Sequence, residues 1–329
     1  MREEILSLLS GHKTDKVPAF SGLIHVTAEG LEHERLNSYE IHHNPQKMAK
    51  AAASTFRLTG MPSAALPLDL CAPAEALGAE LRFYIDEFRF PQVGQVKFES
   101  TSEIPTLELE GMNIREQGRI KMICDALSFL KDDIGNQAVI AGIIPGPFTL
   151  LLYACKPKNV FIELKKDPTS LSNALSLLTS LLARIGQAYL DAGADFITIH
   201  EMGGSPGFIG PSRFVQFVLP PLQKLIAELS TPTVLSICGN TNKSLISLAQ
   251  TGATAISVDQ TADLAASRSA LKGMLLFGNL DPVHTLSGGT ISEIKNAVQS
   301  AINAGVDAVW PGCDLVPQTP IENLKALQS

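Results

Sequence analysis

The second half of this chain repeats one junction three times, in which an amphipathic helical stretch ends at a glycine and a short apolar run follows within a few residues. The three glycines are Gly193, Gly252 and Gly305. The stretch over residues 168–192 shows the pattern most fully, because Asp167 can cap its first turn and its apolar residues keep to one face. Repeated helix–strand units of this kind predict an α/β fold with a parallel sheet.

Short apolar runs that predict buried strands occur eight times along the chain. They cover residues 17–20, 63–67, 139–143, 196–199, 234–237, 255–258, 275–277 and 306–310. Eight such runs with helical stretches between them predict a (β/α)8 TIM-type barrel. We therefore expect residues 1–329 to form a single domain, a barrel with an N-terminal extension and an inserted hairpin over residues 80–107, where apolar residues alternate.

The charge balance excludes some classes of partner. The chain has 33 acidic and 26 basic residues, a net charge of −7, and no run rich in Lys and Arg. We therefore expect no binding to nucleic acid or to an anionic membrane surface. Residues 138–155 carry no charge, but Pro145-Gly146-Pro147 interrupts them, which predicts a buried strand, a turn and a short helix instead of a membrane span.

The five cysteines are an odd number at wide spacings, which argues against structural disulfides. Met1 is followed directly by charged residues and not by a secretory leader. We therefore expect a cytoplasmic protein. In that compartment an unpaired cysteine is usually a small core residue and occasionally a ligand or a nucleophile.

The chemistry of a parallel barrel lies at the carboxyl ends of its strands, so the residues that follow the apolar runs are the first candidates for a site. These residues are Ser21, Asp69, Cys71, Pro145-Gly146-Pro147, His200-Glu201, Cys238-Gly239-Asn240, Asp259-Gln260, Gly278-Asn279-Leu280-Asp281 and Pro311-Gly312-Cys313-Asp314. Three of the five cysteines, Cys71, Cys238 and Cys313, are in this set, together with five carboxylates and one imidazole.

Cys238 and Cys313 follow two of the later predicted strands, whose ends would converge on one mouth. Two thiolates, one or two nitrogen or oxygen ligands and an open position make up a catalytic type of zinc site. A thiol substrate in the open position would be deprotonated at neutral pH and would remain nucleophilic. The alternative is that both cysteines are inert core residues, since free cysteine is often buried.

His200 and Glu201 are adjacent in the sequence, so on a strand their side chains point to opposite faces. Only one of them can face the barrel mouth. We expect Glu201 to face inward and His200 to pack against the helices outside the barrel.

Three aspartates at strand ends, Asp69, Asp259 and Asp281, can serve as general acids or bases, or can cap the helices that follow them. The pairs Gly239-Asn240 and Gly278-Asn279 predict tight turns at which the backbone approaches a ligand.

Several motifs resemble those of the uroporphyrinogen decarboxylase superfamily, a barrel family, over nearly the whole chain. They are Lys16-Val17-Pro18, Pro73-Ala74-Glu75-Ala76-Leu77-Gly78, Gly146-Pro147-Phe148-Thr149-Leu150, Gly278-Asn279-Leu280-Asp281-Pro282 and Thr319-Pro320-Ile321-Glu322-Asn323. Within it, the chain is most similar to the methylcobalamin:coenzyme M methyltransferase branch. The motifs of that branch are matched by Ile237-Cys238-Gly239-Asn240, Ile256-Ser257-Val258, Pro311-Gly312-Cys313, His43-Asn44-Pro45 and Met48-Ala49-Lys50.

The resemblance implies an enzyme that moves a methyl group from methylcobalamin, or from a methylated corrinoid on a partner protein, to a small thiol such as coenzyme M. That branch holds zinc through a His-x-Cys pair and a distant cysteine. The two cysteines correspond to Cys238 and Cys313, but the histidine corresponds to Ser236, which is a poor zinc ligand. We expect Glu201 to complete the metal site, ahead of His200.

The resemblance also assigns expected roles to other residues at the strand ends. Asp69 and Tyr153 match the active-site aspartate and tyrosine of the decarboxylase branch, and with Glu201 they are the expected catalytic residues. The residues expected to bind the substrate or the corrinoid are Asn240, Gly278, Asn279 and Asp281.

Two alternative functions follow from the same resemblance. Decarboxylation of a tetrapyrrole is the second candidate, but its substrate carries several carboxylates, and residues 21–34 lack the arginines that the family uses to bind them. The third candidate is a barrel without catalytic activity that binds a corrinoid or a tetrapyrrole, which the serine at position 236 would favour.

Overall fold

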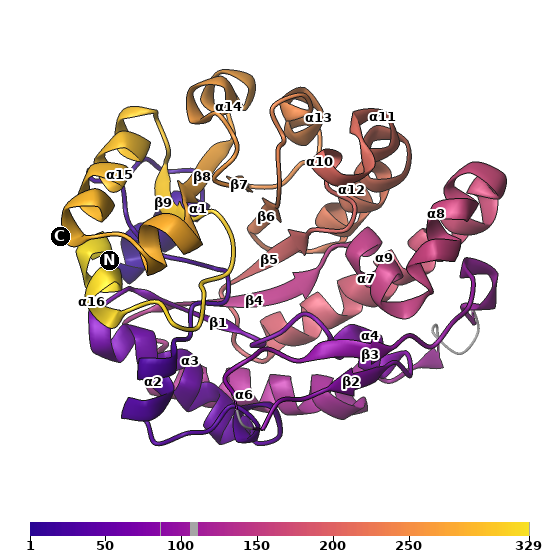
Figure 1. Cartoon of the computed structure of the whole chain (residues 1–329), viewed down its shortest axis with the longest axis horizontal. Helices are drawn as coiled ribbons and strands as arrows, with labels where there is room; N and C mark the ends of the chain where they lie inside the picture. Colours follow the sequence, from indigo (N-terminus) through magenta and orange to yellow (C-terminus); the bar gives the residue numbers. More distant parts are fainter. Residues whose placement is uncertain (86, 106–110, 329) are drawn as a thin grey trace.

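A parallel sheet of seven strands curls around the centre of the molecule, and helices cover its outer face (Figure 1). The computed structural model describes residues 1–85, 87–105 and 111–328. The strands, in their order across the sheet, are β1 (Ser63–Leu66), β4 (Val139–Pro145), β5 (Phe196–Glu201), β6 (Thr233–Ile237), β7 (Ala255–Val258), β8 (Leu275–Leu280) and β9 (Ala308–Pro311). This order confirms the predicted α/β, TIM-like class, since consecutive parallel strands are neighbours.

The first predicted strand, residues 17–20, does not form a regular strand. Ala19 makes an isolated parallel bridge to Val309, and Val309 N–H donates to the Pro18 carbonyl at 2.9 Å. On the other side, Ser21 N–H donates to the Ser63 hydroxyl at 2.9 Å. Pro18 has no N–H to donate to a neighbouring strand, and the segment is joined to β1 only through the Ser63 side chain. The segment therefore fills the eighth position between β9 and β1, and the prediction of eight regular strands is wrong by this one.

The helices lie on the outside of the sheet and at its ends (Figure 1). Among them, α9 is capped by Asp167, whose side chain accepts from Ser170 N–H, as the sequence predicts. The α-helices are α1 (Arg2–Leu9), α2 (Ala28–His33), α3 (Pro45–Thr59), α4 (Ala72–Ala76), α6 (Gly118–Ile134), α7 (Pro147–Ala154), α8 (Pro157–Lys166), α9 (Pro168–Asp191), α10 (Pro206–Ile209), α11 (Pro211–Arg213), α12 (Leu219–Glu228), α13 (Leu245–Ala249), α14 (Leu264–Ala270), α15 (Ile291–Asn303) and α16 (Ile321–Lys325). Short 3-10 or π-helical turns are η1 (Glu40–His42), η2 (Thr101–Glu103), η3 (Ile114–Glu116), η4 (Phe214–Val218), η5 (Pro282–Ser287) and η6 (Ala326–Gln328).

The inserted hairpin is present but shorter than predicted. Strands β2 (Glu80–Arg82) and β3 (Gln92–Gln95) pair antiparallel. Phe98 then bonds through its N–H to the Ala154 carbonyl at the end of α7, which fastens the segment beside the barrel. Residues 86, 106 and 107 of the predicted hairpin lie outside the described part of the chain.

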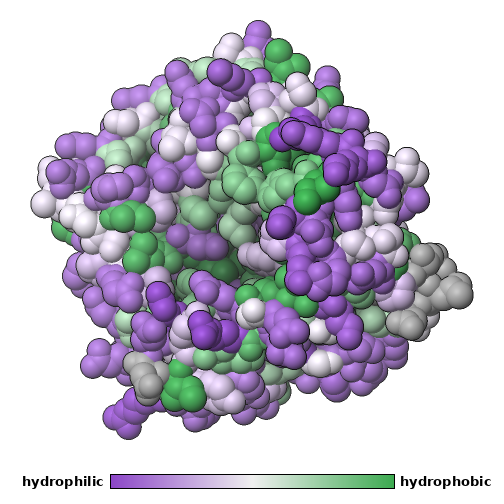
Figure 2. Space-filling view, turned by 45° about the vertical axis from the view of Figure 1, so that its right-hand side comes forward, coloured by the Kyte–Doolittle hydropathy of each residue, from purple (hydrophilic) through white to green (hydrophobic). Residues whose placement is uncertain are grey.

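The interior of the barrel is packed with side chains. Phe20, Phe277 and Trp310 meet there with ring centroids 5.1 to 5.6 Å apart, and all three are buried. Packed layers of this kind fill TIM-type barrels, so a ligand has to bind at the mouth. Strands β1, β4 and β5 lead into helices on the right of Figure 1, and Figure 2 brings that side forward to show a hollow with hydrophobic side chains in its wall.

The uncharged residues 138–155 form β4 and α7, both buried in the fold, as the proline and glycine between them predict. Within the described ranges of the chain, no helix combines the length and the apolarity that a membrane crossing requires.

Candidate metal centre and adjoining pocket

Three side chains with metal-binding atoms converge at the carboxyl ends of β5, β6 and β9. His200 Nε2 lies 3.1 Å from Cys238 Sγ and 4.0 Å from Cys313 Sγ, and the two sulfurs are 3.5 Å apart. Within the described residues, this is the group of three or more His, Cys, Asp or Glu side chains whose atoms converge closely enough to hold one metal ion. The two cysteines singled out by the sequence therefore do meet.

The triangle formed by these three atoms has the size that zinc requires. Zinc binds sulfur at about 2.3 Å and imidazole nitrogen at about 2.0–2.1 Å, so neighbouring ligand atoms of a tetrahedral site are about 3.6–3.8 Å apart. The three observed separations, 3.1, 3.5 and 4.0 Å, lie on both sides of this range. Three protein donors of this type leave a fourth position open, which is the arrangement of catalytic zinc sites.

The register of the sheet explains why His200 takes part. His200 on β5 is paired with Ser236 on β6, and both are buried. Cys238 follows Ser236 by two residues, just beyond the end of the strand. A histidine on β5 thus lies directly beside the position that, by the family resemblance, carries the metal-binding histidine. The Ser236 hydroxyl is buried and makes no hydrogen bond to the described residues.

The prediction that Glu201 faces the cysteines while His200 packs outside is wrong. Alternation along β5 does place the two side chains on opposite faces, but His200 is the inward one. The Glu201 carboxylate lies at the start of α7, where it accepts from Phe148 N–H at 3.1 Å and from the Thr149 hydroxyl at 2.5 Å. It also accepts from Gly204 N–H at 2.8 Å. Glu201 therefore caps a helix and is not placed to bind the same metal.

Burial of Glu201 depends on the glycine that precedes α7. A Cβ atom at Gly146 would lie 2.2 Å from Glu201 Oε2 and 2.6 Å from its carboxyl carbon. Those distances are well inside van der Waals contact, so only glycine fits here without displacing the carboxylate.

We expect Gly146→Ala to lower the free energy of unfolding by about 1–3 kcal/mol, the usual cost of overpacking a filled core. Gly94→Ala is the matched control, because a Cβ there would meet its nearest neighbour at 3.5 Å, and its effect should stay within about 0.5 kcal/mol. Denaturant unfolding of both variants measures the difference, and equal stabilities would contradict the steric argument.

The electrostatics of the site link its imidazole to a fourth residue, Asp314. Burial alone would lower the pKa of His200, but the Asp314 carboxylate and Cys313 raise it to about 9. Burial raises the pKa of Asp314 to about 6. Hydrogen bonds from Cys238 and His200 lower the pKa of the Cys313 thiol, although burial opposes this shift.

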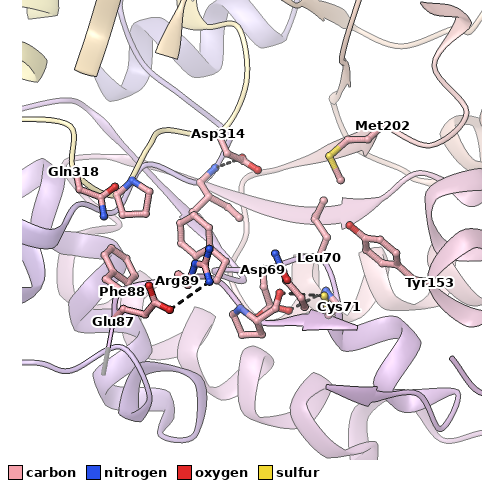
Figure 3. Close-up of a pocket in the computed structure, with 15 residues that line it drawn as sticks. Asp69, Leu70, Cys71, Glu87, Phe88, Arg89, Tyr153, Met202, Asp314 and Gln318 are labelled. Atoms are coloured by element: carbon pink, nitrogen blue, oxygen red, sulfur yellow. Dashed lines mark hydrogen bonds and ion pairs between the residues drawn. The ribbon is translucent and has the colours of Figure 1, made fainter. Parts of the chain in front are cut away.

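A pocket of about 430 Å³ is connected to this centre through Asp314, which lines it (Figure 3), whereas His200, Cys238 and Cys313 are not among its lining residues. Asp314 lies at one side of it, Met202 and Tyr153 at another, and the Glu87–Arg89 pair of the hairpin lies opposite. The remaining lining residues are Ile24, Asp69, Leu70, Cys71, Phe88, Phe90, Pro91, Gln92, Pro317 and Gln318. Of the described residues that line the pocket, Arg89 alone is basic, whereas three are acidic.

Asp69 lines this pocket, but its carboxylate is already bound. It forms a buried ion pair with Arg119, accepts from Cys71 N–H at 2.8 Å, and lies 3.4 Å from His42 Nδ1. Although burial favours the neutral form, Arg119 and His42 hold the pKa of Asp69 well below its usual range. The Asp69 carboxylate therefore stays ionised and is held on the protein side of the pocket wall.

Tyr153 of α7 lines the pocket as well, and burial raises the pKa of its hydroxyl, which keeps the phenol protonated. Of the residues expected to bind substrate or corrinoid, Asn279 is held by the protein, since its amide donates to the Asp259 and Ala262 carbonyls at 3.0 Å each. Asp281 caps η5 by accepting from Val283 N–H at 2.8 Å.

The two other residues with that expected role lie on turns. Asn240 is exposed, and its side chain accepts from Asn242 N–H at 3.1 Å in the turn after β6. Gly278 has a φ of 142° and packs against the Val258 carbonyl. The binding roles of Asn240 and Gly278 stay predictions, since neither residue lines the pocket next to Asp314.

Two residues of the site were given no role from the sequence. Asp314 is among the strand-end residues that follow the apolar runs, directly after Cys313, and that place was the available signal. Arg119 lies on α6, far from Asp69 in the sequence, and no local pattern links the two residues. Only the packing of α6 against the barrel brings them together.

Known proteins resemble this chain over its whole length. The family model of uroporphyrinogen decarboxylase (URO-D) matches residues 1–329. Methylcobamide:CoM methyltransferase MtaA of Methanosarcina barkeri is 30% identical, covering 99% of this chain and 96% of its own length. Methylcobamide:CoM methyltransferase MtbA of Methanosarcina acetivorans is 28% identical over the same shares.

Solved structures agree with this similarity. A methyltransferase from Methanosarcina mazei superimposes with a TM-score of 0.94 at 29% identity and covers 99% of this chain and 96% of its own. A B12-independent methionine synthase from Shewanella superimposes with a TM-score of 0.60 at 14% identity, covering 94% and 95% of the two chains, and this likeness shows the fold alone.

Proposed function

Because the chain belongs to the uroporphyrinogen decarboxylase family, and its relatives include methylcobamide:CoM methyltransferases, we propose that it transfers a methyl group from a methylated corrinoid to a small thiol. The observation that carries this proposal is the convergence of His200, Cys238 and Cys313 beside a pocket. The acceptor would be coenzyme M or another small thiol.

His200, Cys238 and Cys313 would hold a zinc ion. Zinc bound by two thiolates and one imidazole lowers the pKa of a thiol in its open position, so that the acceptor sulfur is present as a thiolate at neutral pH. No carboxylate is needed to complete the ligand set, and Glu201 is replaced by His200 in this role.

The protein's own residues position the acceptor. The pocket is lined largely by apolar groups, and Tyr153 and Met202 face into it beside Asp314 (Figure 3). Methyl transfer forms a bond between the acceptor sulfur and the methyl carbon and breaks the bond between that carbon and cobalt. The electron pair of the broken bond stays on cobalt, and the thiol proton leaves to water.

The corrinoid would approach from the hollow at the mouth, because a corrinoid ring with its side chains does not fit in a pocket of about 430 Å³ together with an acceptor. We therefore propose that the donor is presented from outside, carried by a partner protein.

The decarboxylase alternative has less support. A tetrapyrrole with several carboxylates requires several cationic groups, and Arg89 is the one basic residue in the described lining of the pocket. Asp69, which would bind the pyrrole nitrogens, is paired with Arg119. A barrel that only binds is disfavoured as well, because His200 supplies the third donor that Ser236 cannot.

Zinc analysis of the purified protein tests the proposal together with a methyl-transfer assay that follows methylcobalamin absorbance with a panel of thiols. We expect about one zinc per chain, and we expect Cys238→Ser and Cys313→Ser to lose zinc and to lower the transfer rate by more than about 100-fold. Cys124→Ser is the control, because this thiol lies on α6 and donates to the Ala188 carbonyl, away from the cluster. A zinc-free wild type, or porphyrinogen decarboxylation without methyl transfer, would overturn the proposal.

A further inference from the structure

One ring nitrogen of His200 points toward the two cysteines, and the other ring nitrogen needs a hydrogen-bond partner. Nε2 is the atom that lies 3.1 Å from Cys238 Sγ. The ring is fully buried, and Nδ1 makes no hydrogen bond to any described residue. A metal-binding histidine normally donates its other N–H to a carboxylate, a carbonyl or water, which fixes the ring and the tautomer. The nearest acidic group to Nδ1 therefore decides how well His200 can serve as a ligand.

That group is Asp314, whose Oδ2 lies 3.7 Å from His200 Nδ1. The other carboxylate oxygen, Oδ1, accepts from Ile24 N–H at 2.9 Å, so the carboxylate is anchored to the segment after residues 17–21. Its side chain is about one-fifth exposed, 22%, on the side of the pocket. Asp314 thus stands between the histidine and the pocket with one oxygen free for the ring.

Three buried carboxylates near the mouth bind other groups, among them Asp259, which accepts from Thr261 N–H and from the Thr261 hydroxyl. Glu201 accepts hydrogen bonds from the start of α7 and from Gly204. Asp69 is paired with Arg119. Asp314 is therefore the carboxylate whose free oxygen is directed at His200.

We propose that Asp314 is the positioning residue of the metal centre. It holds the proton of His200 on Nδ1 and fixes the ring so that the Nε2 lone pair faces the two sulfurs. This inference rests on the proposed metal site and adds to it a residue that binds no metal itself. The family resemblance places the metal-binding histidine at position 236, so both the histidine at position 200 and the carboxylate that orients it differ from what that resemblance implies.

Asp314→Asn separates the two functions of the carboxylate. The amide oxygen of asparagine can still accept from Ile24 N–H, but the negative charge beside His200 is lost. We expect the zinc dissociation constant, measured by competition with a chromogenic chelator, to rise about 10- to 100-fold. We expect the thermal midpoint of the metal-free protein to change little. Asp263→Asn is the matched control, because Asp263 only caps α14 and asparagine caps equally well.

Two spectroscopic readouts distinguish positioning from a general loss of structure. In the cobalt(II)-substituted protein, the sulfur charge-transfer bands should persist in Asp314→Asn, whereas the ligand-field bands should shift as the histidine loosens. In the zinc-loaded wild type, long-range ¹H–¹⁵N spectra should show the proton of His200 on Nδ1, and this measurement stands even if the variant fails to fold. If the wild type binds zinc, then unchanged affinity and unchanged bands in Asp314→Asn overturn the inference and leave the proposed function intact. A His200 proton on Nε2 in the zinc-loaded protein would overturn the inference and would also remove His200 from the proposed ligand set, because a protonated nitrogen cannot bind zinc. A wild type without zinc overturns both the inference and the proposed function.

Discussion

Replacing His200 with alanine is expected to lower zinc affinity by more than the roughly 10- to 100-fold that changes around a ligand cost, and to abolish methyl transfer. His200 is the one nitrogen donor of the cluster. Two cysteines alone leave two positions to water, and the acceptor thiol would then compete for a weakly held ion.

The companion variant is His200→Ala/Ser236→His, which moves the histidine one strand across the sheet. Positions 200 and 236 are paired in register, and the serine is buried without a hydrogen bond. An imidazole at position 236 can therefore use the space that the His200 ring vacates. We expect the double variant to recover most of the zinc affinity, since it restores the ligand arrangement implied by the family resemblance.

Equilibrium dialysis against zinc and the methylcobalamin assay measure both variants. His33→Ala is the control, because this histidine is exposed at the end of α2 and should change neither result. Full zinc binding by His200→Ala would show that the imidazole is not a ligand. A double variant no better than His200→Ala would show that the two positions are not equivalent.

The second large effect is expected from Arg119→Met, in the buried pair beneath the pocket. The Asp69 carboxylate is 1% exposed and Arg119 is 8% exposed, so removing the cation leaves an uncompensated buried charge. Breaking a buried pair in this way costs about 3–5 kcal/mol of unfolding free energy. Asp69→Asn/Arg119→Met removes both charges and should be less destabilised than the single variant.

The loss should depend on pH with a definite sign. Because the pKa of Asp69 is lowered in the folded protein, the pair contributes its full stability above the unfolded pKa of about 3.9 and loses it as the pH falls toward the folded value. In Arg119→Met the cation is gone and burial favours the neutral form, so the pKa of Asp69 is higher in the folded variant than in the folded wild type. The gap in unfolding free energy between the two proteins should therefore begin to narrow above about pH 4, and should keep narrowing as the pH falls toward the pKa of Asp69 in the folded wild type. Urea unfolding at a series of pH values measures this gap.

Arg115→Met is the matched control for the buried pair. Arg115 pairs with Asp191 at the surface, where the two side chains are 58% and 43% exposed. Exposed pairs contribute about 0–1 kcal/mol because water screens them. If both arginine variants lost the same unfolding free energy, the Asp69–Arg119 pair would be solvated and would contribute no more to stability than a surface pair.

The course of the sheet could be read from the sequence because apolar runs, glycine joints and caps are local signals. Seven of the eight predicted strands form, in sequence order. The failure at residues 17–20 has a local cause as well, since Pro18 cannot donate and Ser21 reaches β1 only through a side chain. A run of apolar residues indicates that a segment is buried, but not that its backbone hydrogen-bonds to a strand on each side.

The candidate site was predictable only in part. The two cysteines follow from their places at strand ends. Which of His200 and Glu201 faces them depends on the phase of one strand, and alternation alone fixes only that they differ. The deciding contacts come from Gly146, whose missing side chain leaves room for Glu201, and no periodicity reveals such a fit in advance.

Because His200 and Ser236 are lateral neighbours in the sheet, a side chain at either position can reach the space between β5, β6 and β9. Two different places in the sequence can therefore supply an imidazole to the same site. In a barrel of this kind, the position of a ligand in space can be the same in two proteins although its position in the sequence differs. A search for the His-x-Cys motif would pass over this chain, although its imidazole occupies the same rung of the sheet.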